Sequence, residues 1–185
     1  KKEAYAIVQP GVIRDELNLK LKEYGLFYGP ETSTSNRCMI GGMIGNNSCG
    51  SRSLIYGSAR EHLKSIKVIL ADGKETEFKA ISTKVFQEKA NGIGTVSALE
   101  TNIYKHAKTL FSNQENRIEI EREFPKKSIP RRNTGYALDL LSDTRPFSNT
   151  EEQFNFCKLL AGSEGTLTFT TEIKLNLVPL PKEHQ

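Results

Sequence analysis

The most distinctive stretch of this 185-residue chain reads Gly41-Gly42-Met43-Ile44-Gly45-Asn46-Asn47-Ser48-Cys49-Gly50-Ser51-Arg52-Ser53. Glycine has no Cβ and tolerates positive φ, so the backbone can come close to a ligand. Successive free N–H groups in a loop form a concave site for anions, and the Asn and Ser side chains add neutral donors and acceptors. The stretch predicts a loop that holds a phosphate, sugar hydroxyls or a ring edge. The alternative is a connection that only turns the chain.

Two familiar phosphate-binding loops do not match this stretch. The spacing from Gly45 to Gly50 is that of a P-loop, but Ser51-Arg52 stands where that loop needs Lys followed by Ser or Thr. A Rossmann fingerprint would need GxGxxG between a strand and a helix, whereas the pattern here is GGxxG. A P-loop NTPase and an NAD site of the Rossmann type are therefore disfavoured.

The segments before and after the glycine-rich stretch indicate both strands and helices. A short apolar run over 4–8 predicts a strand, and the spacing of apolar residues predicts helices over 13–24, 95–111 and 114–124. Strands over 65–71 and 74–79 flank Asp72-Gly73, which predicts a hairpin with a type I′ turn. Because strands and helices do not alternate strictly, we expect an α+β fold with a mostly antiparallel sheet flanked by helices, in a single domain over 1–185.

A second unusual segment, Gly162-Ser163-Glu164-Gly165, precedes a long alternating run over 166–177. Leu167, Phe169, Thr171, Ile173, Leu175 and Leu177 fall on one side of a two-residue period, so the run predicts a half-buried strand. The two glycines would expose N–H groups at the entrance to that strand. A tight turn after a helix explains the segment equally well.

The composition is that of an ordinary globular domain, with 37% hydrophobic and 26% charged residues. The 26 basic and 22 acidic residues give a net charge of +4, and the densest basic cluster is Lys126, Lys127, Arg131 and Arg132. A nucleic-acid binder would show a larger excess and interleaved aromatic residues, so no nucleic-acid partner is expected. Three cysteines without a CxxC pair predict neither a disulfide framework nor a metal site, and we expect a cytoplasmic protein.

Four motifs in order resemble the FAD-binding domain of the vanillyl-alcohol-oxidase superfamily, also called the PCMH type. The similarity points to the FAD-linked oxidases of D-2-hydroxy acids such as D-lactate, glycolate and 2-hydroxyglutarate. The motifs are Val8-Gln9-Pro10-Gly11-Val12, Gly29-Pro30-Glu31-Thr32-Ser33-Thr34, the run over 40–53 with Tyr56-Gly57, and Gly162-Ser163-Glu164-Gly165-Thr166-Leu167. The stretch over 131–138 is most similar to large members that carry an iron–sulfur region.

The resemblance implies non-covalent FAD and an oxidoreductase that moves a hydride from a hydroxy acid to FAD. Pro30 to Thr34 and Gly41-Gly42 would line the ribityl chain and the isoalloxazine. Asn46 to Ser51 would offer backbone and side-chain donors, and Glu164-Gly165 with Phe169 would close around the adenosine. The implied cofactor-binding residues are Pro30, Glu31, Thr32, Ser33, Thr34, Gly41, Gly42, Gly45, Asn46, Asn47, Ser48, Gly50, Ser51, Glu164, Gly165 and Phe169. Glu31 stands where many relatives have Asp.

The resemblance also implies parts that this sequence does not contain. Members of the family clasp the FAD pyrophosphate with a further loop of the form RGGGTSxxG, and nothing here matches it. We therefore expect the second half of an FAD-binding domain, with partners in the same longer protein: an N-terminal half-domain, a C-terminal substrate cap and an iron–sulfur region. No catalytic residue is assigned, because His62, His106 and His184 fall outside the motifs. This half alone is expected to bind FAD weakly and to be inactive; the alternative function is a basic binding module.

Overall fold

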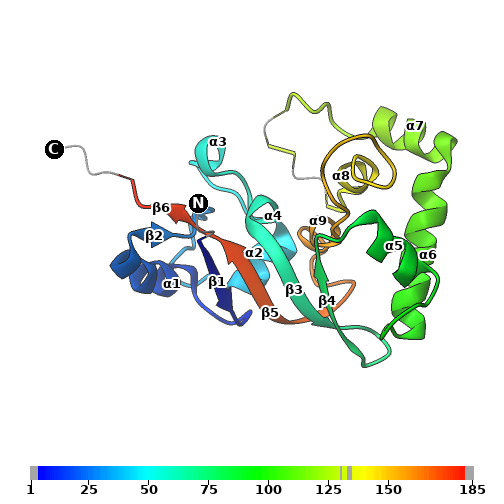
Figure 1. Ribbon diagram of the computed structural model, residues 1–185. Helices are drawn as coiled ribbons and strands as arrows, with labels where there is room; N and C mark the ends of the chain where they lie inside the picture. The colour runs from blue at the N-terminus through cyan, green and yellow to red at the C-terminus, as the bar shows by residue number, and fades with distance from the viewer. Residues whose placement is uncertain (1–3, 130, 133–134, 182–185) are drawn as a thin grey trace.

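The computed structural model describes residues 4–129, 131–132 and 135–181. Its centre is a four-stranded, fully antiparallel sheet with the order β1-β5-β3-β4, and helices surround it (Figure 1). The α+β fold with a mostly antiparallel sheet is thus confirmed. The strands are β1 (Tyr5–Val8), β3 (Leu63–Ile69), β4 (Glu75–Lys79) and β5 (Phe169–Asn176).

The N-terminal part of the chain agrees closely with the sequence prediction. After β1 come α1 (Arg14–Leu21) and a 3-10 turn, η1 (Lys22–Tyr24), which ends at Gly25 with φ of +67°. Glycine is needed there because an L side chain in the left-handed region is strained. A second small sheet then pairs β2 (Leu26–Phe27) with β6 (Val178–Pro179), which brings the end of the described chain back to its beginning.

The predicted hairpin forms, but its turn differs from the prediction. The N–H of Leu70 donates to the carbonyl of Lys74 at 2.9 Å, so three residues lie in the loop rather than two. Within this loop only Gly73 has positive φ, at +75°, whereas a type I′ turn needs it at two positions. A three-residue loop with glycine in the left-handed position is the next most common solution, and it explains why Asp-Gly still marks the hairpin.

The long alternating strand is shorter and less evenly buried than its pattern predicts. Ile173 and Leu175 are fully buried and Leu177 is 5% exposed, as expected for the inward side of β5. Leu167 and Phe169, on the same side of the period, are 40% and 68% exposed. The two-residue period places them on one face, but nothing in the described structure covers that end of the strand.

A helical group fills the connection between β4 and β5, to one side of the sheet (Figure 1). Its core is a set of aromatic rings in edge-to-face contact. The ring centroid of Phe86 lies 4.7 Å from that of Phe154 and 5.5 Å from that of Tyr104. Such contacts add about 0.5–1.5 kcal/mol each beyond burial. Helices over 98–112 and 114–123 confirm two predictions, whereas the sequence did not predict the others. The elements are α5 (Thr83–Ala90), α6 (Ala98–Ser112), α7 (Gln114–Glu123), α8 (Leu138–Ser142) and α9 (Cys157–Leu160).

Three helices between β2 and β3 carry the glycine-rich stretch and the residues up to the start of β3: α2 (Ile40–Asn46), α3 (Ser53–Tyr56) and α4 (Ala59–His62). α4 begins with a reciprocal capping box, in which Glu61 accepts from the N–H of Ser58 at 2.7 Å. In the described part of the chain, no helix is long and apolar enough to cross a membrane.

Candidate cofactor site

The first half of the glycine-rich stretch is a helix, which corrects the prediction of an open loop. In α2, Ile40, Met43 and Ile44 are buried, and this spacing of three and four residues anchors one helix face in the core. The first two N–H groups are also engaged, since Ile40 donates to Val12 and Gly41 donates to Pro10, each at 2.9 Å. Burial of three large side chains outweighs the low helix propensity of glycine, about 1 kcal/mol per residue.

The three glycines of α2 differ in the space around them. A Cβ on Gly41 would lie 2.6 Å from Cβ of Pro10, so this position allows the helix to pack against the turn after β1. A Cβ on Gly45 would make ordinary contacts at 3.7 Å with Glu164 and Gly165. Gly42 is exposed, and a Cβ there would meet nothing within 4 Å. Gly42 is therefore the position where α2 leaves an open backbone surface.

The turn at 162–165 docks on the C-terminal end of α2. Gly162 donates its N–H to the carbonyl of Ile44, and Glu164 donates its N–H to the carbonyl of Gly45, both at 2.9 Å. In addition, Asn46 Nδ2 donates to Glu164 Oε1 at 3.0 Å. These bonds satisfy carbonyls that a helix end leaves without a partner. They bring together two predicted motifs that are 118 residues apart in the sequence.

Glu31 ties the predicted loop over 30–34 to the C-terminal end of the glycine-rich stretch. Its Oε1 accepts from Ser51 Oγ at 2.6 Å and from the N–H of Arg52 at 3.0 Å. The Ser51 hydrogen bond is the main reason why the pKa of Glu31 lies below its usual range, with the Arg52 N–H and charge adding to it. Gly50 permits the approach, because a Cβ there would lie 2.4 Å from Cγ of Glu31.

Several predicted residues face the protein rather than solvent. Pro30 is buried, and its carbonyl accepts from Arg14 Nε at 3.1 Å. Asn47 and Ser48 are 1% and 7% exposed, and Asn47 Oδ1 accepts from the N–H of Arg60 at 2.8 Å. These three position the loop, and their contact with the cofactor stays a prediction. Thr32 Oγ1 lies 3.2 Å from Thr34 Oγ1, while Ser33 is exposed.

Phe169 is separate from the assembled group. It begins β5 and pairs with Ile69, next to the β3–β4 turn. Its ring is 68% exposed, and no ring contact of this residue is found in the described structure. The structure thus joins the segments 30–34, 41–51 and 164–165 through hydrogen bonds and close approaches, but it does not join Phe169 to them.

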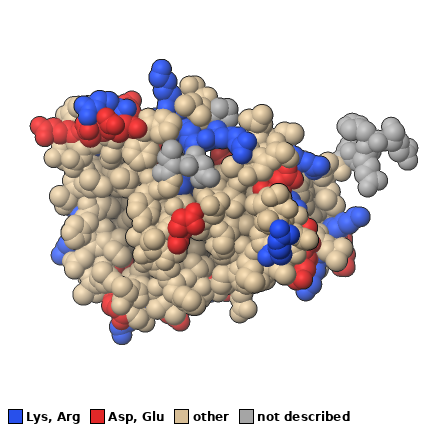
Figure 2. Space-filling model, turned by 180° about the vertical axis from the view of Figure 1, so that it is seen from behind, with Lys and Arg blue, Asp and Glu red and all other residues tan. Residues whose placement is uncertain are grey.

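The surface that carries α2 is weakly charged. α2 lies behind the sheet in Figure 1, and Figure 2 shows that the middle of this rear face holds few charged side chains. Gly42, Asn46 and Glu164 are exposed, and a Cβ on Gly42 would meet nothing within 4 Å.

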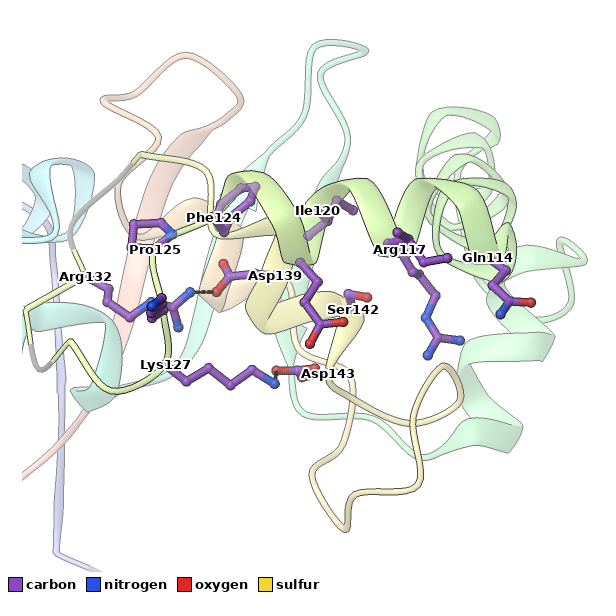
Figure 3. Close-up of a pocket in the computed structure, with 13 residues that line it drawn as sticks. Gln114, Arg117, Ile120, Phe124, Pro125, Lys127, Arg132, Asp139, Ser142 and Asp143 are labelled. Atoms are coloured by element: carbon purple, nitrogen blue, oxygen red, sulfur yellow. Dashed lines mark hydrogen bonds and ion pairs between the residues drawn. The ribbon is translucent and has the colours of Figure 1, made fainter.

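The basic segment has acidic partners that the sequence did not reveal. A pocket of about 500 Å³ lies between α7 and α8 (Figure 3). In it, Lys127 Nζ is 2.5 Å from Asp143 Oδ2, and Arg132 forms an ion pair with Asp139. Two of the four clustered cations are therefore neutralised within the protein, which weakens the case for a polyanion surface.

Cys157 and His62 are both buried in the protein. Cys157 is buried, which raises the pKa of its thiol to about 12. His62 is 5% exposed and lies between two carbonyls, with Nδ1 3.0 Å from that of Asn176 and Nε2 2.6 Å from that of Tyr56. His106 is on α6, and His184 lies outside the described residues. Within the described ranges, no group of His, Cys, Asp and Glu could hold a metal ion.

Comparison with known proteins shows what the chain is similar to. Residues 1–79 match the family model of the FAD binding domain, which covers β1 through β4 and all of α2. The chain is 36% identical over 175 residues to D-2-hydroxyglutarate dehydrogenase of Pantoea ananatis, and 35% identical over 184 residues to that of Haemophilus influenzae. These matches cover 95% and 98% of this chain but 16% and 17% of those proteins.

The fold itself is also found among solved structures. A solved structure of alkyldihydroxyacetonephosphate synthase superposes with a TM-score of 0.53, at 16% identity, over 98% of this chain and 21% of that one. By these sequence matches the chain is part of an FAD-binding domain, with FAD as the cofactor. The relatives that it matches over nearly its whole length are D-2-hydroxyglutarate dehydrogenases. It spans about a sixth of the length of these two curated relatives.

Proposed function

We propose that this chain is the second half of the FAD-binding domain of a longer dehydrogenase that oxidises a D-2-hydroxy acid. The observation that carries the proposal is the docking of the Glu164 turn on the end of α2, next to the open backbone at Gly42. Two motifs that the family uses for FAD meet here on one weakly charged face. The similarity to D-2-hydroxyglutarate dehydrogenases over nearly the whole chain supports 2-hydroxyglutarate as the first substrate to test.

The residues of this chain would bind and orient the cofactor rather than perform chemistry. When bound, FAD supplies the acceptor for a hydride from the α-carbon of the hydroxy acid. Gly42 would let the backbone of α2 approach it, and Asn46 would offer its amide. The bonds from Glu31 to Ser51 and Arg52 would keep the loop over 46–51 in place.

The remaining parts of the site would come from the same longer protein. We propose an N-terminal half-domain with a pyrophosphate loop, a C-terminal cap that carries the catalytic groups, and an iron–sulfur region. We also propose a reducing, cytoplasmic location, which is in keeping with the free thiols of Cys38, Cys49 and Cys157.

The test is purification of the longer protein, followed by anaerobic mixing with D-2-hydroxyglutarate. We expect bound flavin, with bleaching of its visible absorption by the D-enantiomer and little change with the L-enantiomer. D-lactate and glycolate, tested in the same way, define the substrate class. A longer protein without flavin, or flavin that none of these acids reduces, would refute the proposal.

The alternative is a basic module that binds nucleic acid through Lys126, Lys127, Arg131 and Arg132. The ion pairs of Lys127 with Asp143 and of Arg132 with Asp139 speak against it. Replacing the four cations with Gln should weaken only a salt-sensitive, sequence-independent binding to polyanions. Tight, sequence-dependent binding at physiological salt that this variant loses would favour the alternative.

A further inference from the structure

A second pocket, of about 500 Å³, shares Lys127 and Arg132 with the α7–α8 pocket. It is bordered by α4, by residues 127–129 and 131–132, and by the chain that leads into α9. The pocket is large enough for a small metabolite. Its charge is strongly asymmetric, because its lining contains two acids, Glu61 and Glu152, and five cations: Arg60, Lys127, Arg131, Arg132 and Lys158.

Most of these charges already have partners. The carboxylate of Glu61 caps α4, and Glu152 Oε1 is 2.5 Å from Lys158 Nζ. Lys127 and Arg132 use their pairs with Asp143 and Asp139 (Figure 3). In the part of the chain that the structure describes, Arg60 and Arg131 have no carboxylate within ion-pair distance. Two guanidinium groups in this pocket therefore lack an ion-pair partner.

Arg60 is the more unusual of the two, because it is only 7% exposed. Nε donates to the carbonyl of Lys158 at 2.9 Å, and Nη2 donates to those of Gly135 at 2.7 Å and Ala161 at 2.5 Å. Nη1 has no partner among the described residues. Carbonyl groups satisfy hydrogen bonds but carry no full charge, so the cost of burying the cation is only partly offset. Burial accordingly lowers the pKa of Arg60, with Asp139 opposing the shift in part.

Two donors without partners lie around the same pocket. In the described ranges, three buried side-chain atoms lack a hydrogen bond: Tyr28 Oη, Ser53 Oγ and Arg132 Nε. The last two belong to residues that line this pocket. Both atoms have almost no accessible surface, so neither of them reaches a molecule in the pocket. Arg131 has a weak partner in the described structure, because its Nη2 donates to Cys49 Sγ at 3.3 Å and sulfur is a poor acceptor.

We infer that this pocket binds a small molecule through an oxyanion group, a carboxylate or a phosphate. Arg60 and Arg131 would supply both the charge and the N–H donors, because neither has a carboxylate partner in the described structure. Arginine suits both groups, because its planar donors match two oxygens at once. Cys49, which follows α2, and Ser53, which begins α3, also line this pocket. The inference is independent of the proposed oxidation and concerns a second binding site.

Isothermal titration of the intact chain at low ionic strength tests the inference, with inorganic phosphate and 2-hydroxyglutarate as probes. We expect saturable binding of at least one probe. Phosphate alone would identify a phosphate group as the ligand, and the dicarboxylate alone would identify a carboxylate. Arg131→Gln should weaken binding about tenfold or more, since it removes a charged donor. Arg131 is exposed, so this variant should fold.

Two further variants separate a built site from general attraction of anions. Arg37→Gln removes the same charge from an exposed arginine that donates to Asn36, and it should leave binding unchanged. Ser53→Ala should leave binding unchanged while raising the urea midpoint of the free chain, because it removes an unsatisfied buried hydroxyl that does not reach the pocket. Absence of binding to both probes at millimolar concentration, or equal weakening by Arg37→Gln and Arg131→Gln, would overturn the inference.

Discussion

Replacing Glu31 with Gln tests whether one carboxylate holds two cofactor loops together. Glu31 accepts from Ser51 Oγ at 2.6 Å and from the N–H of Arg52 at 3.0 Å. A hydrogen bond to a charged group contributes about 1.5–3 kcal/mol when buried. The Glu31 side chain is 23% exposed and Gln keeps one acceptor, so we expect the variant to lose about 1–2 kcal/mol of unfolding free energy. For a chain of this size, that corresponds to roughly 2–8 °C in Tm.

The effect of this substitution should depend on pH with a definite sign. The pKa of Glu31 is lowered in the folded state, chiefly by the Ser51 hydrogen bond. Its contribution is therefore fully present above the ordinary pKa near 4.5 and is lost as the pH falls through the lowered value. The difference in stability between wild type and Glu31→Gln should be largest at neutral pH. It should shrink as the pH falls through the lowered pKa of Glu31.

The assay is urea unfolding followed by circular dichroism, at neutral pH and in steps down to about pH 3.5, the window set by carboxylate titration. Glu119→Gln is the matched control, because Glu119 pairs with Arg122 at 2.5 Å on the exposed face of α7. Surface pairs contribute about 0–1 kcal/mol, so this control should change little. An equal effect of the two substitutions, or a Glu31 effect that does not vary with pH, would refute the reasoning.

The glycines of α2, the incomplete cofactor site and the buried thiol each lead to a test. Gly42→Val should leave the urea midpoint close to wild type yet remove FAD from the longer protein, whereas Gly41→Val should cost about 1–3 kcal/mol by overpacking against Pro10; a folded Gly42→Val protein with full FAD content would contradict this. The chain alone should bind FAD more weakly than micromolar in calorimetric titration, and submicromolar binding would show that this half suffices. Cys157, with its raised pKa and burial, should react with a thiol reagent at pH 8 far more slowly than Cys49, and equal rates would count against the burial of this thiol.

The elements that could be predicted from the sequence are those whose signals are local. The strand over 4–8, the helices around α1, α6 and α7, and the β3–β4 hairpin all form, because each has its own period, cap or turn residues. α2 differs from the predicted loop because Gly41, Gly42 and Gly45 are typical of loops, although its three buried apolar residues have helical spacing. The exposed start of β5 also differs from the prediction, since alternation shows which residues share a face but not whether anything covers it.

The candidate site, too, could be predicted only in part from the sequence. The motifs could be recognised from the sequence, and the structure joins most of them, but the bonds that join them connect residues far apart in the chain. The acceptors of Arg60 illustrate the limit: its guanidinium reaches carbonyls at Gly135, Lys158 and Ala161, which lie 75 to 101 residues later in the chain. Main-chain carbonyls leave no trace in residue identity, so no pattern could have indicated this buried cation.

The order of strands also determines when the sheet can be completed. β1 is the first strand in the chain, but its only described strand partner is β5, so that Tyr5 pairs with Asn176 across nearly the whole sequence. During synthesis, the β3–β4 hairpin and the aromatic group around Phe86 can form from local contacts, while β1 must wait. Pairings of such high contact order are slow because loop closure comes first. Premature termination within the loop before β5 would therefore remove the central strand and leave β1 and β3 as two unpaired edges, the kind of surface that drives aggregation.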